Sequence, residues 1–206
     1  MNRSFLVGLR LSIGILILVA VISQALYIHN VGALNIVNFL SYFTNLSNIL
    51  AGVIFIFSGL YLAQSRNPNA KDDIIRGAAT LYMAVTGLVY ITLLSGEDLG
   101  LLMPWVNFVT HILAPIVIVS DWLYQPPRTK LVTKQISWWL IFPAGYLVYT
   151  LIRGSIVGWY PYPFLNPATV GGYGGVALYC LAILTAFFVL SWLLMKLGRT
   201  LKRNVA

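Results

Sequence analysis

Long apolar stretches separated by short polar segments occupy most of the chain. A helix of about 20 apolar residues is long enough to span the hydrocarbon core of a bilayer. Six such helices are predicted, over residues 4–28, 37–63, 74–94, 105–124, 136–153 and 173–197. We therefore expect an all-α, polytopic membrane protein in which residues 1–206 form a single six-helix transmembrane domain.

Composition and charge agree with this expectation. The chain is 59% hydrophobic and 9% charged, whereas a soluble domain is about one quarter charged. Of its 13 basic residues, all except Arg153 fall on one side of the predicted helices. The net charge of +8 is therefore interpreted as the positive-inside bias of a multi-pass protein of the plasma or cytoplasmic membrane, with both termini cytoplasmic. We expect membrane lipids as partners and do not expect the chain to bind nucleic acid.

Polar residues recur at helical spacing in the second predicted helix. They are Asn38, Ser41, Thr44, Asn45 and Asn48. A polar group that faces hydrocarbon costs several kcal/mol, so this stripe is expected to face protein or a water-filled cavity. Such a stripe indicates either a functional site or hydrogen bonding between helices.

His111 lies inside the apolar run of the fourth predicted helix. An ionisable side chain within a membrane is usually functional, although a histidine with a purely structural role is the alternative. Asn107 lies one turn earlier on the same face. Pro115 has no N–H group, so it frees the carbonyl of His111 from its usual helical partner.

Thr44 and His111 are predicted at similar depths, roughly 10 Å and 9 Å below the surface away from the termini. The pair is therefore a candidate nucleophile and general base, at a site nearer the non-cytoplasmic side. The alternative for Thr44 is a hydroxyl bonded to the carbonyl of Leu40, a common arrangement in membrane helices. Asp121 lies roughly 15 Å further along its helix and is expected to pair with Arg128 or Lys130 instead of orienting His111.

The remaining polar residues supply candidate supports for this pair. Asn45 and Asn48 are candidate donors to an oxyanion, and Ser41 and Asn107 are further polar supports. Arg153 is expected either to hold a substrate carboxylate or headgroup, or to reach toward lipid headgroups.

Other features of the sequence add little chemistry. The segment 159–167 is rich in proline and aromatic residues and is expected to cover the outer mouth of the bundle or to form an interfacial aromatic belt. The single cysteine, Cys180, is interpreted as a small buried residue. No cofactor and no metal are expected, because none of the usual binding motifs is present.

Three segments together resemble the androgen-induced membrane hydrolase family. They are the run 39–50 containing Phe43-Thr44-Asn45-Leu46-Ser47-Asn48, the run from His111-x-x-x-Pro115 to Asp121-Trp122, and Tyr160-Pro161-Tyr162-Pro163-Phe164-Leu165. The resemblance implies a six-helix membrane enzyme that hydrolyses fatty acid esters of hydroxy fatty acids with an intramembrane threonine and histidine. The matching positions are Thr44 and His111.

The leading hypothesis is thus an intramembrane threonine hydrolase that cleaves a lipid ester through an acyl-threonine intermediate. A lipid-binding or transport protein that uses the same polar cavity is the first alternative, and a structural membrane scaffold is the second.

Overall fold

The computed structural model describes residues 2–66, 69–129, 131–132 and 134–203, and these contain helices and no strands. Six helices are long and apolar enough to span a membrane. They cover Arg3–Asn30, Phe43–Ala63, Ala70–Leu94, Pro104–Tyr124, Ser137–Val157 and Tyr173–Leu201. The described residues thus confirm the predicted all-α architecture and the six helices of membrane-spanning length and composition.

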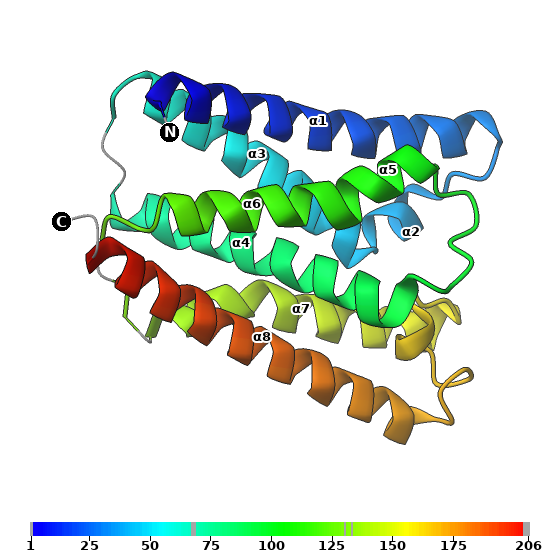
Figure 1. Ribbon diagram of the computed structural model, residues 1–206. Helices are drawn as coiled ribbons and strands as arrows, with labels where there is room; N and C mark the ends of the chain where they lie inside the picture. The colour runs from blue at the N-terminus through cyan, green and yellow to red at the C-terminus, as the bar shows by residue number, and fades with distance from the viewer. Residues whose placement is uncertain (1, 67–68, 130, 133, 204–206) are drawn as a thin grey trace.

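Some of these spans consist of more than one helical element. The elements are α1 (Arg3–Asn30), α2 (Ile36–Leu40), α3 (Phe43–Ala63), α4 (Ala70–Val89) with the π-helical η1 (Tyr90–Leu94), α5 (Pro104–Phe108) with the π-helical η2 (Val109–Leu113) and α6 (Ala114–Tyr124), α7 (Lys134–Val157), the 3-10 turn η3 (Pro163–Leu165) and α8 (Tyr173–Arg203). The two ends of the chain lie at the same end of the bundle (Figure 1).

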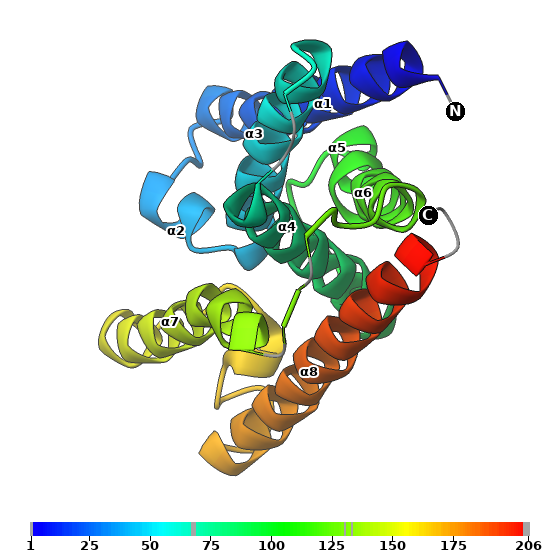
Figure 2. The ribbon, with the colours of Figure 1, turned by 90° about the vertical axis from the view of Figure 1, so that its left-hand side faces the viewer.

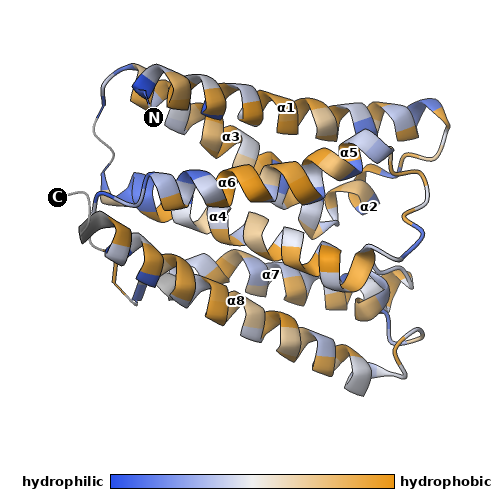
Figure 3. Cartoon of the chain, viewed as in Figure 1, coloured by the Kyte–Doolittle hydropathy of each residue, from blue (hydrophilic) through white to orange (hydrophobic). Residues whose placement is uncertain are grey.

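Helix α4 is the centre of the bundle. The span that contains it is 56% buried, whereas the spans of α7 and α8 are each 17% buried. Viewed along the bundle, α1, α3 and α6 lie on one side of α4, and α7 and α8 diverge on the other (Figure 2). Much of the outer face of the long helices is apolar (Figure 3), as expected for surfaces that contact lipid.

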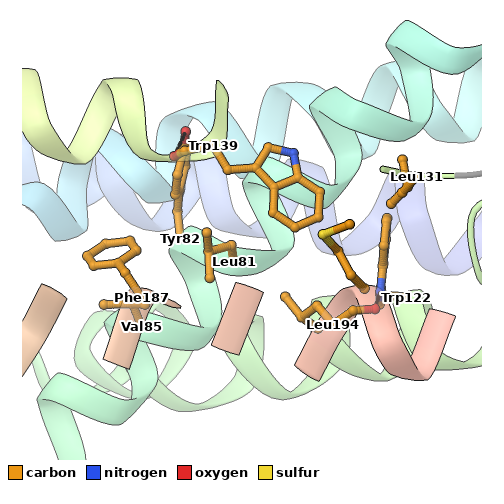
Figure 4. Packing of buried hydrophobic residues seen from close by; sticks show 9 residues of the cluster. Leu81, Tyr82, Val85, Trp122, Leu131, Trp139, Phe187 and Leu194 are labelled. Carbon is orange, nitrogen blue, oxygen red and sulfur yellow. Dashed lines mark hydrogen bonds between the residues drawn. The ribbon is translucent and has the colours of Figure 1, made fainter. Parts of the chain in front are cut away.

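Two tryptophans anchor α4 to its neighbours. Trp122 of α6 and Trp139 of α7 are fully buried and meet edge to face (Figure 4). The indole N–H of Trp139 donates to the carbonyl of Ile74 at 2.9 Å, and the Tyr82 hydroxyl donates to the Trp139 carbonyl at 2.9 Å. Gly77 makes room for this packing, because a Cβ there would stand 2.3 Å from the Trp139 ring.

The predicted continuous helix over residues 37–63 is wrong. The chain forms the short helix α2, breaks at Ser41 and Tyr42, and begins α3 at Phe43. Ser41 is nearly helical, with φ −84° and ψ −6°, but Tyr42 is extended, with φ −78° and ψ 124°. The break places Thr44 in the first turn of a helix, where backbone N–H groups have no partner within that helix.

The predicted pairing of Asp121 with Arg128 is also wrong. The Asp121 carboxylate pairs with Arg10 Nε at 2.8 Å and with Arg76 Nη1 at 3.1 Å, and all three side chains are buried. Arg10 is bidentate, since its Nη2 lies 2.9 Å from Asp121 Oδ2. The other predicted partner, Lys130, lies outside the described residues. Arg10, Arg76 and Asp121 form a charge group, the Asp121 charge group, which joins α1, α4 and α6 near the end that carries the termini.

We expect Asp121→Leu to destabilise the protein by about 3–5 kcal/mol, because it leaves two buried guanidinium groups without their carboxylate. Unfolding of purified protein in mixed detergent micelles measures the change. Glu97→Gln, which removes an exposed carboxylate, is the control and is expected to have little effect. Equal stability of the two variants would contradict a structural role for the Asp121 charge group.

Candidate active site

Thr44 lies in the first turn of α3 and bonds to the segment that follows α7. Its Oγ1 and its backbone N–H are each 3.1 Å from the hydroxyl oxygen of Tyr162. Both side chains are buried. The hydroxyl of Thr44 therefore does not bond to the carbonyl of Leu40, unlike those of Thr80, Thr110 and Thr185, which each donate to the carbonyl four residues earlier.

The Thr44–Tyr162 pair keeps one hydrogen to donate. The Tyr162 oxygen accepts from the Thr44 N–H, and only one of the two hydroxyl hydrogens is used in the bond between the side chains. Burial raises the pKa of the Tyr162 phenol to about 12, so the phenol keeps its proton at neutral pH. The remaining hydrogen is available to an acceptor such as an ester carbonyl.

Two further tyrosines, both from α7, form hydrogen bonds to Ser41 at the helix break. The Tyr146 hydroxyl donates to the Ser41 carbonyl at 3.0 Å. Ser41 Oγ donates to the carbonyl of Val37, so the Tyr149 hydroxyl, 2.9 Å away, must be the donor to that Oγ. The broken helix is thus held by hydroxyls from another span and from the following loop.

An apolar cavity of about 650 Å³ opens beside Thr44. It lies between α4, α7 and α8, and Phe164 and Leu165 of η3 contribute to its wall. The lining residues that carry a hydroxyl are Thr44, Thr86, Tyr146, Tyr162 and Tyr173. Thr86 Oγ1 is buried and has no hydrogen-bond partner among the described residues. The volume falls in the range of small-molecule sites, and the lining suits acyl chains with one polar group.

His111 is buried in η2, beyond the residues that line this cavity. Its ring stacks on Tyr90 of η1, with 4.6 Å between the ring centres. Its Nδ1 lies 3.1 Å from Thr110 Oγ1, whose only hydrogen is donated to the Val106 carbonyl. Nδ1 must therefore be the donor, and in the neutral imidazole Nε2 carries the lone pair that a general base needs.

Both rings of this stack belong to π-helical segments. Tyr90 begins η1 and His111 lies at the middle of η2. Ala114 continues the wide turn by donating to the carbonyl of Val109, five residues earlier. Pro115 follows and has no N–H to offer. Single π-helical turns occur frequently at functional sites.

Asn48 links the helix of Thr44 to the segment of His111. Its amide nitrogen donates to the Thr44 carbonyl at 2.9 Å and to the Thr110 carbonyl at 3.2 Å, while its Oδ1 is buried without a partner. α3 and η2 thus meet at this level. Within the described residues no hydrogen bond joins Thr44 to His111, so their direct contact stays a prediction.

The other predicted residues serve mainly as structural supports. The Asn45 amide donates to the Phe39 carbonyl across the helix break, and the Asn107 amide donates to the Tyr90 hydroxyl at 2.9 Å. Asn48 has both amide hydrogens on backbone carbonyls, which leaves none for an oxyanion. Arg153 donates to Asn38 Oδ1 at 2.6 Å and lies over the Trp159 ring, away from the cavity lining.

Sequence reasoning missed Tyr162 and Thr86. The available signal for Tyr162 was the aromatic, proline-rich loop, which was expected to lie over the mouth of the bundle. Instead Tyr162, Phe164 and Leu165 are buried, and Tyr162 reaches Thr44. Nothing in the sequence distinguishes Thr86 from the threonines whose hydroxyls bond within their own helix.

Tyr162→Phe is expected to destabilise the protein by about 1–3 kcal/mol, because it leaves the buried N–H of Thr44 without an acceptor. Thermal unfolding measures the loss, and hydrogen exchange at the Thr44 amide should become faster. Tyr27→Phe, which removes an exposed phenol from α1, is the matched control. Unchanged exchange at Thr44 would show that the phenol does not hold the start of α3.

Comparison with protein-family models, with curated proteins and with solved structures returns no match. Among the described residues, no three histidine, cysteine, aspartate or glutamate side chains come together as a metal site. The resemblance to the androgen-induced membrane hydrolase family stays an expectation drawn from the sequence motifs. The geometry of Thr44, Tyr162 and His111 therefore has to support any functional conclusion.

Proposed function

We propose that this chain is an intramembrane hydrolase of lipid esters in which Thr44 is the nucleophile and His111 the general base. The observation that carries the proposal is the position of Thr44, which lines a mostly apolar cavity of about 650 Å³ and whose hydroxyl lies 3.1 Å from that of Tyr162. Acyl chains would lie between α7 and α8, and the ester carbonyl would lie against these two hydroxyls.

The proposed reaction uses these groups in two steps. Thr44 Oγ1 attacks the ester carbonyl carbon while its proton passes to His111 Nε2, and Tyr162 donates a hydrogen bond to the developing oxyanion. The alcohol leaves with the proton from His111, and an acyl-threonine remains. Water activated by His111 then cleaves the acyl-threonine, so that ester and water yield acid and alcohol.

Proton transfer requires Thr44 and His111 to be linked by a water molecule or by a change of side-chain rotamer. Asn48 supports such a link, because it joins the two backbones and has an unpartnered Oδ1 beside them. Catalytic hydrogen bonds are often long or misaligned before substrate binds. The π-helical turns around Tyr90 and His111 supply a segment that can adjust.

A lipid-binding or transport protein without hydrolysis is the second candidate. It is favoured by one observation, namely that His111 bonds to Thr110 and stacks on Tyr90 with no bond to Thr44. In that case the cavity holds a lipid whose carbonyl accepts the spare hydrogen of the Thr44–Tyr162 pair.

The hydrolase proposal is tested by turnover of branched lipid esters with purified protein. Thr44→Ala is expected to lower kcat/KM by at least about a thousandfold, because a nucleophile is lost. His111→Gln should lower it by about 10²–10⁴, the usual contribution of a general base. Thr185→Ala, which removes an exposed hydroxyl from α8, should leave turnover unchanged.

Turnover retained in both Thr44→Ala and His111→Gln would exclude the proposed chemistry. Bound lipid recovered with wild-type protein that has no esterase activity on these substrates would favour the second candidate.

Filling the cavity is expected to block ligand entry in either case. Ala177→Trp places an indole in the cavity wall, whereas Ala182→Trp places one on the same helix away from it. The sole cysteine, Cys180, also lines the cavity, so the rate of its maleimide labelling reports occupancy. We expect added lipid ester to slow labelling of the wild type and of Ala182→Trp. Labelling of Ala177→Trp should not respond to lipid, because its cavity is already filled. Labelling that lipid never slows would show that the cavity does not take lipid.

A further inference from the structure

A second cavity, of about 550 Å³, lies at the end of the bundle that carries the termini. It is formed by α1, α3, α4, the end of α6 and the turn after it. Four arginines line it, and they are Arg10, Arg66, Arg76 and Arg128. None of the chemistry proposed for Thr44 uses this cavity, which lies at the opposite end of the spans.

The carboxylates near these arginines are already engaged. Asp121 is paired with Arg10 and Arg76, and Asp73 Oδ2 accepts from the backbone and the hydroxyl of Thr129 at 2.8 Å each. Asp72 Oδ2 accepts from the backbone N–H of Asn69 in a capping box at the start of α4.

Two of the arginines that line this cavity keep donors that no described hydrogen bond uses. Arg76 is 8% exposed and uses two of its five N–H groups, on Asp121 and on the Gln125 carbonyl. The guanidinium group of Arg66 lies 4.3 Å from the centre of the Tyr61 ring, and no described carboxylate forms an ion pair with it. A buried arginine with free donors beside an exposed one is suited to an anion with several oxygens.

The other walls of the cavity are apolar. They include Ile54, Phe57 and Leu62 of α3 and Ile75 of α4. Phe57 and Ile75 are about half exposed, at 52% and 50%. On a membrane protein such exposed side chains contact acyl chains. A free phosphate ion would gain nothing from this apolar wall. A phospholipid, in contrast, would place its headgroup on the arginines and its acyl chains on the apolar wall.

We infer that this cavity binds an anionic phospholipid of the adjacent leaflet, with its phosphodiester on Arg66 and Arg76 and an acyl chain along Phe57 and Ile75. The negative charge of a phosphodiester suits the guanidinium groups of Arg66 and Arg76. Basic pockets between membrane helices bind anionic headgroups by the same chemistry.

Native mass spectrometry of the purified protein, titrated with lipid, tests the inference. Phosphatidylglycerol is expected to bind more tightly than phosphatidylcholine. Arg66→Gln and Arg128→Gln should each raise the dissociation constant for phosphatidylglycerol about fivefold, which corresponds to about 1 kcal/mol per basic residue. Lys71→Gln removes a charge from the same end of the bundle but outside the cavity lining, so it should change little.

Equal binding of the two lipids, or an equal loss in Lys71→Gln, would overturn the inference, because either result indicates unspecific attraction. Glycerol phosphate, which carries the phosphate without acyl chains, tests whether the ligand is a soluble phosphate. If it binds as tightly as the lipid and displaces it, the ligand is a free phosphate and the assignment to phospholipid is wrong. Failure to displace the lipid supports the role of the apolar wall.

Discussion

The break between α2 and α3 is the feature on which the candidate site depends. A helix that ends near hydrocarbon exposes backbone groups that have to be satisfied by protein. Tyr146 and Tyr162 do so here, with one hydroxyl on the Ser41 carbonyl and the other on the Thr44 N–H. Because these tyrosines come from α7 and the loop after it, the break ties that half of the chain to α3.

That constraint also explains the apolar cavity. The loop after α7 turns inward so that Tyr162 reaches the start of α3, and Phe164 and Leu165 follow it into the bundle. α7 and α8 diverge on the side of α4 where the cavity lies (Figure 2). A hydroxyl pair with one hydrogen left to donate then meets space suited to acyl chains, which is the basis of the proposed ester chemistry.

The sequence predicted the six helices because apolar runs of bilayer length allow few other structures. It could not predict the break, since neither glycine nor proline marks Ser41 and Tyr42, and the Tyr146 hydroxyl that satisfies it lies 105 positions away. The same reason explains the error for Asp121, which pairs with Arg10 from a distance of 111 positions instead of with a neighbour. The polar stripe was found, but its Asn45 and Ser41 support the break instead of the chemistry.

The most direct measurement of the central claim is the site of modification by a lipid-tailed fluorophosphonate, read by peptide mass spectrometry. The account predicts a single adduct on Thr44, which is reduced when a lipid ester competes for the cavity. An adduct on another side chain, or an unmodified Thr44 in protein that hydrolyses the ester, would contradict it.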